Sequence, residues 1–171
     1  MKTLVQCLSI IALCIITQSL QAQKTIFESY HLGIVQPILS VNQGDAHYFY
    51  ENEFYAIGFP IGLTCRMSES VKFDLEFVPF VKPNADLNKP FEINFLFHPG
   101  FLFPLSGGWT FGTRLAFETV GAFGLSPLLN KSFGIGGDRV FFIELVAPAR
   151  WGPQKNNSYT QALAVHVGLG F

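Results

Sequence analysis

The residues best suited to chemistry in this 171-residue chain are two histidines, His98 and His166, in otherwise apolar segments. A histidine held by a carboxylate can act as a general base, and Glu76 and Glu144 lie in similar segments. Such a base needs a nucleophile within reach, yet His98 is followed by Pro-Gly and His166 by Val-Gly. A metal site of His98, His166 and Glu144 is disfavoured because no two of these residues are closely spaced along the chain. We therefore expect no catalytic site and no metal site.

A network of buried charges explains the same residues better. Its candidate members are Glu76, His98, Arg114, Glu144 and His166. Buried charges are tolerated only when they are paired, so we expect Arg114 to be the hub and to pair with Glu76 or Glu144. His31 and His47 stand apart from this set, and we expect them to be surface residues or satisfied core residues.

The elements that must position these side chains alternate with a period of two. Along residues 91–103 large apolar side chains fall on one face, and Glu92, Asn94 and His98 fall on the other, which is typical of a β-strand. The same pattern predicts eight strands, at residues 26–39, 54–66, 71–80, 91–103, 109–120, 124–133, 141–147 and 161–171.

Composition indicates which way the apolar faces point. Only 13% of the residues are charged, against about 25% in soluble domains, and the chain holds 19 phenylalanines. The longest charge-free stretch of the mature chain, residues 93–113, contains prolines and glycines and does not predict a membrane helix. We therefore predict an all-β, antiparallel up-and-down transmembrane barrel with a bore filled by side chains. Its lipid-facing residues are expected to be Phe73, Phe77, Phe95, Phe97, Phe101, Phe111, Phe117, Phe141, Val165, Val167 and Leu169.

The connections between these strands alternate in length. Residues 67–70, 105–108 and 134–138 are predicted tight turns, whereas residues 40–53, 82–90 and 149–160 are longer and polar. An unusually short connection at residues 121–124 is the exception. Aromatic residues that favour the membrane–water interface occur near both ends of the strands, namely Trp109, Trp151, Tyr48 and Tyr159.

The N-terminus predicts export. A short positive start is followed by an apolar run from Leu4 to Ile16 and a small residue at Ala22, which is typical of a cleavable signal peptide at 1–22. The barrel would then comprise residues 23–171. Cys65 is the one cysteine of this part, so no internal disulfide can form. The mature chain is slightly acidic, without the basic patch of a nucleic-acid-binding protein, and no cofactor is expected.

With these features the chain resembles the small eight-stranded Gram-negative outer-membrane barrels of the OmpA-domain and OmpX type. The last strand, with Val165, Val167, Gly168, Leu169 and Phe171, is similar to the signal read by the barrel-assembly machinery. The resemblance implies an outer-membrane location, both termini in the periplasm, and contact with outer-membrane lipid and lipopolysaccharide. High proline content departs from it, since Pro37, Pro60, Pro79, Pro99, Pro127 and Pro148 lie in or beside predicted strands and require bulges or strand ends.

The function favoured by this resemblance is that of a non-enzymatic barrel in envelope structure, or of an accessory subunit in a larger outer-membrane complex. A lipid-modifying enzyme, such as a lipid A deacylase or acyltransferase, is the first alternative. The deacylase resemblance would require a His-x-Ser-Asn stretch in a late strand, which this sequence lacks. A soluble lipocalin-like binding barrel, with its phenylalanines inside, is the second alternative.

Overall fold

The structure is a computed structural model that describes residues 26–51, 55–83, 88–152 and 159–171. The predicted signal peptide, residues 1–22, lies outside the described residues. No helix in the described ranges is long and apolar enough to cross a membrane. The elements are β1 Phe27–Asn42, β2 Asp45–Tyr48, β3 Ile57–Gly58, β4 Ile61–Arg66, β5 Lys72–Pro83, β6 Phe91–Pro104, the 3-10 turn η1 Ser106–Gly108, β7 Trp109–Glu118, β8 Phe123–Gly136, β9 Arg139–Val146, β10 Ala149–Trp151 and β11 Tyr159–Gly170.

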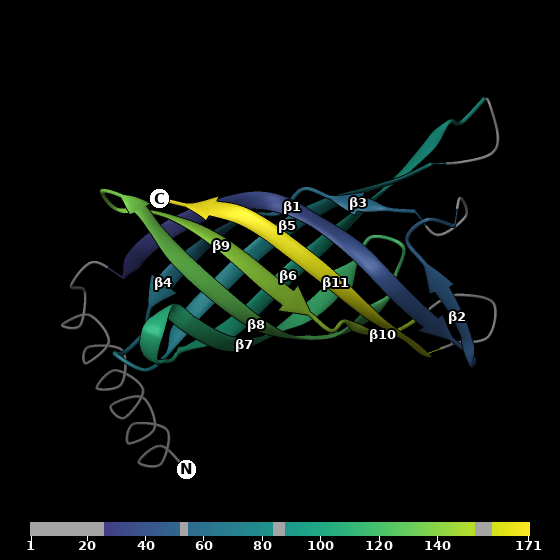
Figure 1. Cartoon of the computed structure of the whole chain (residues 1–171). Coiled ribbons are helices and arrows are strands. Elements are labelled where there is room, and N and C mark those ends of the chain that lie inside the picture. Colours follow the sequence, from purple (N-terminus) through teal and green to yellow (C-terminus); the bar gives the residue numbers. More distant parts are fainter. Residues whose placement is uncertain (1–25, 52–54, 84–87, 153–158) are drawn as a thin grey trace, which may run out of the picture.

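These strands close into a barrel with eight antiparallel positions (Figure 1). We call each position a stave, because β3 and β4 together occupy one of them. The first and last staves pair along most of their length, from His31 opposite Gly170 to Asn42 opposite Thr160. The prediction of an all-β, eight-stranded antiparallel barrel is confirmed.

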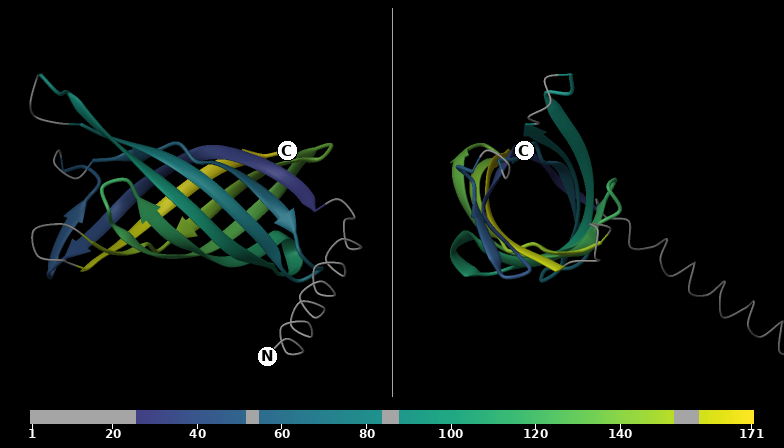
Figure 2. Two further views of the ribbon diagram at one scale, coloured as in Figure 1. Left: turned by 180° about the vertical axis from the view of Figure 1, so that it is seen from behind. Right: turned by 90° about the vertical axis from the view of Figure 1, so that its right-hand side faces the viewer.

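The strands run obliquely around the ring (Figure 2). The stagger of the barrel follows from the residues that pair across neighbouring strands. Starting at Phe77 on β5, the paired residues through β6 and β7 lead to Phe123 on β8. In the opposite direction around the barrel, through β4, β1, β11 and β9, they lead to Phe133 on β8. One circuit therefore shifts the register by ten residues. Such a stagger requires tilted strands, and with eight staves it leaves a bore that side chains can fill.

The two ends of the barrel differ. At the turn end the strands are joined through residues 67–71, 105–108 and 137–138, and the C-terminus lies there as well (Figure 1). At the loop end the connections are longer, apart from the short one between β7 and β8, and the β5–β6 hairpin projects furthest (Figure 2). The bore is hollow toward the turn end, with a cavity of about 440 Å³ that reaches Trp109, Asp138 and Phe171.

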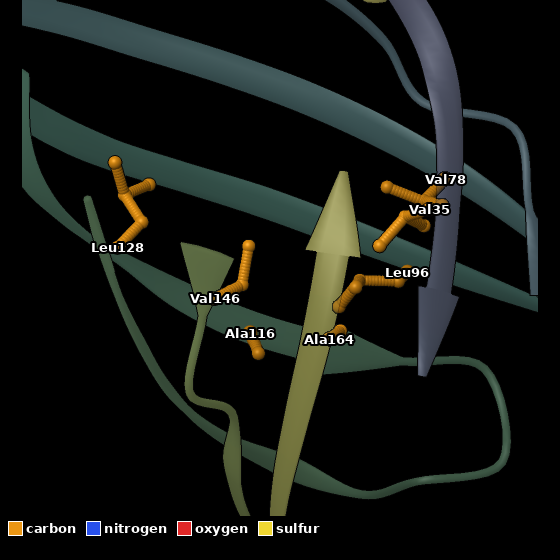
Figure 3. Packing of buried hydrophobic residues seen from close by; sticks show 7 residues of the cluster. All are labelled: Val35, Val78, Leu96, Ala116, Leu128, Val146 and Ala164. Carbon is orange, nitrogen blue, oxygen red and sulfur yellow. The ribbon is translucent and has the colours of Figure 1, made fainter. Parts of the chain in front are cut away.

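An apolar ring crosses the bore on its loop side. Val78 and Val146 are the inward-facing residues that follow Glu76 and Glu144 on the same strands, because inward positions recur every second residue. The ring consists of the buried side chains of Val35, Val78, Leu96, Ala116, Leu128, Val146 and Ala164 (Figure 3).

Several predicted boundaries are wrong. The strand predicted at 54–66 is divided at Pro60, and the connection predicted at 40–53 contains the β1–β2 hairpin. The connection predicted at 149–160 includes β10, which pairs with both β8 and β11. Strand β8 continues to Gly136 through a register shift between Gly134 and Gly136, which is typical of glycine in a strand. Strands β2, β3 and β10 are too short to show an alternating pattern, so the sequence does not reveal them.

The prolines are accommodated in two ways. Pro37 coincides with a register shift between β1 and β11, and Pro60 separates β3 from β4. Pro148 lies between β9 and β10. Pro79, Pro99 and Pro127 each pair in register with one neighbouring strand, and the ladder on their other side is interrupted. The expectation of a bulge or strand end thus holds for Pro37, Pro60 and Pro148, whereas the other three prolines lie inside strands without a bulge.

Candidate functional site

A cluster of charges around Arg114 fills the middle of the bore. Arg114 Nη1 donates to Glu144 Oε1 at 2.8 Å, and Arg114 Nε donates to Asp74 Oδ2 at 2.7 Å. Arg114 Nη2 lies 3.7 Å from Glu76 Oε2. All four side chains are at most 3% exposed. The strand opposite provides space for the guanidinium stem at Gly100, where a Cβ atom would lie 2.6 Å from Arg114 Cγ.

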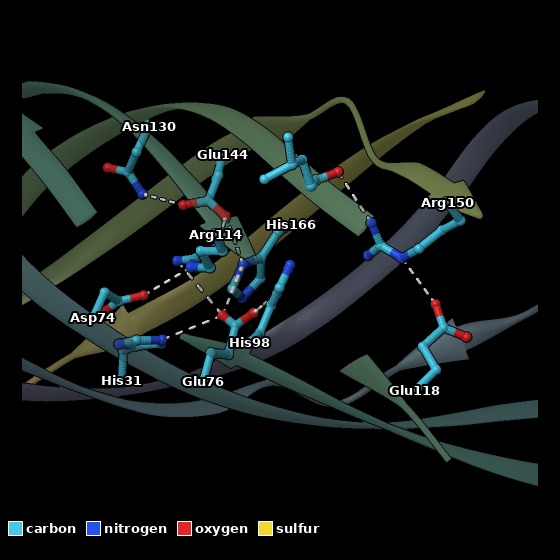
Figure 4. A network of polar contacts seen from close by, with 11 residues as sticks. His31, Asp74, Glu76, His98, Arg114, Glu118, Asn130, Glu144, Arg150 and His166 are labelled. Carbon is cyan, nitrogen blue, oxygen red and sulfur yellow. Dashed lines mark hydrogen bonds and ion pairs between the residues drawn. The ribbon is translucent and has the colours of Figure 1, made fainter. Parts of the chain in front are cut away.

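Three histidines surround this charge cluster (Figure 4). His98 Nδ1 lies 3.1 Å from Glu76 Oε1, and His31 Nε2 lies 3.3 Å from Glu76 Oε2. His166 Nδ1 lies 3.3 Å from Glu144 Oε1. The neighbouring strands place these pairs directly, because Glu76 is opposite His98 and Glu144 is opposite His166 in the register. Arg114 holds one positive charge against three carboxylates, and the histidines are further groups that can carry positive charge.

Neutral side chains complete the coordination of the carboxylates. Thr64 Oγ1 donates to Asp74 Oδ1 at 2.8 Å, and Asn130 Nδ2 lies 3.4 Å from Glu144 Oε2. A buried carboxylate without donors is costly, so these contacts add to the stabilisation that Arg114 provides. Most polar contacts of this group are therefore among its own members. We call it the central cluster and define it by Asp74, Glu76, Arg114, Glu144, His31, His98 and His166.

The structure brings together the five residues predicted for an interior network and adds two that were not predicted. Asp74 joins the network through its bond to Arg114. His31 is a satisfied core residue, which is one of the two environments expected for it. The expectation that it stands apart from the network is wrong, since Gly62 on the adjacent strand gives its ring room beside Glu76. His47 also has a partner, Glu51, at 3.3 Å.

Two further ion pairs lie toward the ends of the bore. On the loop side Arg150 Nε donates to Glu118 Oε1 at 2.9 Å, and Asn94 Nδ2 donates to Glu118 Oε2 at 2.6 Å. At the turn end Glu28 contacts Lys72 at 2.5 Å and Arg66 at 3.1 Å. Polar pairs therefore flank the central cluster at both ends.

The chemistry that this arrangement supports is mutual charge compensation. Each carboxylate of the central cluster contacts Arg114, and each histidine contacts a carboxylate. No group of three or more histidine, cysteine or carboxylate side chains in the described part of the chain has a geometry that could hold a metal ion. The apolar ring lies between this cluster and the loop end.

The outer face carries the residues predicted to face lipid. Phe77, Phe95, Phe97, Phe101, Phe111, Phe117 and Val167 are exposed, and Phe73, Phe141, Val165 and Leu169 are half-buried. Lys131 Nζ lies 5.3 Å from the centre of the Trp109 ring near the turn end. At the loop end the rings of Trp151 and Tyr159 lie 5.2 Å apart, and the rings of Tyr48 and Tyr50 lie 5.6 Å apart.

The last strand completes the ring. Its residues Val165, Val167, Gly168 and Leu169 pair with β1 on one side and β9 on the other. The backbone of Phe171 exchanges two hydrogen bonds with Tyr30, and their rings stack 5.5 Å apart. The residues of the predicted assembly signal thus lie in the stave that closes the barrel.

The ring of staves and its filled bore define a class, the small closed eight-stranded β-barrels. Among solved structures, the crystal structure of Neisserial surface protein A (NspA) matches with a TM-score of 0.52 and 13% identity, covering 84% of this chain and 97% of that chain. Ail, the attachment invasion locus protein of Yersinia pestis, matches with a TM-score of 0.46 and 10% identity over the same shares. The match to NspA confirms the barrel fold that the resemblance implies. No protein-family model matches the chain, and no curated protein matches it.

Proposed function

We propose that this protein is an integral outer-membrane barrel of a Gram-negative bacterium that acts without catalysis, in envelope structure or as an accessory subunit of a larger outer-membrane complex. The observation that carries the proposal is the inverted distribution of side chains. Large apolar residues are exposed on every stave, while Asp74, Glu76, Arg114 and Glu144 are buried. A continuous exposed apolar surface is unfavourable in water and favourable in hydrocarbon.

The two ends of the barrel support a defined orientation. Trp109 and Lys131 lie near the turn end, and Trp151, Tyr159 and Tyr48 lie near the loop end, so aromatic residues occupy both depths at which a membrane meets water. Short turns on the periplasmic side and longer loops outside are typical of such barrels. Both termini would then be periplasmic, and the loops would contact lipopolysaccharide.

The side chains that cross the bore support a role without transport. The central cluster and the apolar ring occupy successive levels between the turn-end cavity and the loop end, and the cavity beside the ring is small, about 60 Å³. We infer that the partners are outer-membrane lipid, the barrel-assembly machinery that reads the last strand, and a larger complex reached through the outer face. No cofactor and no nucleic acid form part of this proposal.

The alternatives make different demands on the same residues. A lipocalin-like barrel requires apolar rings inside, whereas the structure places Phe77, Phe97 and Phe101 on the outer face, so this alternative fails. A lipid-modifying enzyme requires a histidine that a lipid can reach, whereas His98 and His166 are at most 4% exposed. His98→Ala and His166→Ala separate the two possibilities when lipid A is analysed in cells that express each variant. Only the loss of an enzyme should change the lipid A profile.

Membrane fractionation tests the proposal directly. The full chain expressed in a Gram-negative host should sediment with the outer membrane, resist alkaline carbonate extraction and migrate faster in unboiled than in boiled samples on a denaturing gel. An epitope inserted beside Asn88 should be reached by antibody on intact cells, and one beside Asp138 should require permeabilisation. Recovery in the soluble periplasmic fraction would contradict the membrane proposal, and the reverse epitope pattern would contradict the orientation.

A further inference from the structure

The outer face of the barrel is divided into two walls of different composition. Staves β5, β6 and β7 are adjacent (Figure 2). Their exposed side chains are mainly phenylalanine. We call this the aromatic wall, defined by Phe77, Phe95, Phe97, Phe101, Phe111 and Phe117. On β9, β11, β1 and β4 the exposed residues at the middle of the barrel are aliphatic, among them Ile143, Val167, Ile34 and Ile61. Among the described residues of these staves, Phe59, between β3 and β4, is the one exposed ring at this depth.

Hydrocarbon chains do not require this division, since aliphatic side chains satisfy a lipid contact on the opposite wall. Phenylalanine rings have few rotatable bonds and pack against other rings in offset or edge-on geometry, so they favour a rigid protein surface. The wall already contains such a pair, Phe77 stacked on Phe95 at 5.4 Å, and at its edge Phe111 stacks on Phe103 at 6.3 Å.

The wall has the area of a stable interface. Its six rings are 38% to 49% exposed. With about 200 Å² for each phenylalanine, they present roughly 500–600 Å². Leu115, Thr113 and Pro99 lie among them and bring the surface close to the roughly 800 Å² per partner of a standard protein–protein interface.

A small polar residue lies at the centre of this wall. Thr113 is opposite Phe101 on one side and Pro127 on the other, and Phe111 and Leu115 flank it along the strand. Its hydroxyl makes no hydrogen bond to any part of the chain that the structure describes. An isolated hydroxyl is unfavourable in hydrocarbon, where no water can satisfy it. The residue also forms a notch among larger side chains.

We propose that the aromatic wall binds a second copy of this chain, related by a two-fold axis along the membrane normal that passes close to Thr113. A two-fold interface uses the same surface on both copies and brings residues near the axis against themselves. The two Thr113 hydroxyls then bond to each other, and rings of each copy pack against rings of the other and over the notch at Thr113. The wall has no charged side chain among its defining residues, so the contact needs no charge complementarity. This inference rests on the proposed membrane location.

Disulfide trapping tests the pairing. In a background of Cys7→Ala, Cys14→Ala and Cys65→Ser, Thr113→Cys is compared with Val167→Cys on the aliphatic wall. The two positions lie at the same depth, because their neighbours Arg114 and His166 meet in the central cluster. Oxidation of isolated outer membranes should give a dimer of twice the chain mass for Thr113→Cys, at least fivefold above the yield for Val167→Cys. Equal yields at both positions, or a cross-link to another protein, would overturn the proposal.

A second measurement covers the case in which cysteine geometry at Thr113 prevents a bond. Sedimentation of the refolded chain in mild detergent should show a dimer, and Phe101→Leu with Phe111→Leu should raise its dissociation constant at least tenfold. The matched pair Ile34→Leu with Leu145→Ile should leave it unchanged. A wild-type monomer at all concentrations would refute the dimer. Because only membrane-inserted protein is cross-linked, absence of the chain from the membrane fraction would instead refute the membrane location.

Discussion

Arg114 is the residue on which the interior depends most. It compensates Asp74 and Glu144 through hydrogen bonds of 2.7 and 2.8 Å in a fully buried setting. We expect Arg114→Gln to lower the free energy of unfolding by about 3–5 kcal/mol, because it leaves buried carboxylates uncompensated. Urea unfolding of the refolded barrel in lipid vesicles measures this change.

A surface arginine provides the control. Arg66 is 61% exposed and pairs with Glu28, so Arg66→Gln should leave the same free energy almost unchanged, because water screens an exposed ion pair. Equal losses for the two variants would mean that the central cluster does not stabilise the barrel.

Gly100 is the second residue with a specific steric role. A Cβ atom there would lie 2.4 Å from the Thr113 carbonyl oxygen and 2.6 Å from Arg114 Cγ. Gly100→Ala should therefore cost about 1–3 kcal/mol in the same unfolding assay. Gly134→Ala is the matched control, because a Cβ atom at Gly134 meets nothing within 4 Å. A neutral Gly100→Ala would show that the sheet relaxes without moving Arg114.

At this scale the sequence reveals the hub but not all its partners. Arg114, Glu76 and Glu144 lie in strands with clear alternation, so their inward orientation follows from the period of two. The pairing with Asp74 depends on how far the Arg114 side chain reaches across the bore. The alternation of residues along a strand contains no information on this distance. His31 lies in the first strand, where Ser29, Tyr30 and Gly33 blur the alternation, so its place beside Glu76 is known only from the barrel closure.

Among the elements, the seam between β1 and β3 is the weakest part of the ring. The two strands share a single register pair, Val35 with Gly58, and beyond it the side-chain amide of Gln36 donates to Ala56 O at 2.9 Å. We expect Gln36→Leu to speed amide hydrogen exchange of residues 55–62 about five- to tenfold, since one hydrogen bond is worth about 1 kcal/mol. Ile34→Leu on the same strand should leave this exchange unchanged. Unchanged exchange in both variants would show that the amide does not hold the seam.

Element boundaries follow the same logic as the residues. Staves with one apolar and one polar face, such as β6 and β7, match the predicted ranges within a few residues. The β3–β4 stave departs from its prediction because Pro60 interrupts the ladder, and β10 departs because three residues are too few for a pattern. Pairing across the ring, and the ten-residue stagger that follows from it, depends on contacts between distant segments and was not predictable from local alternation.

For the whole molecule, the account requires a closed bore. The central cluster and the apolar ring cross it at successive levels, so the purified barrel reconstituted in planar lipid bilayers should show no stepwise ion conductance. A porin inserted under the same conditions is the positive control. Regular conductance steps from the wild-type chain would contradict a structural role for the interior.

The orientation of the apolar faces is the claim on which everything else depends, and spin-label accessibility measures it most directly. Labels are placed by Ile34→Cys, Leu145→Cys and Val167→Cys in a Cys65→Ser background, with Asn88→Cys at the loop end for comparison. In lipid vesicles the first three labels should collide often with oxygen and rarely with a water-soluble nickel complex, and the label at position 88 should show the reverse. Frequent collisions of all four labels with the nickel complex would contradict a lipid-facing barrel wall.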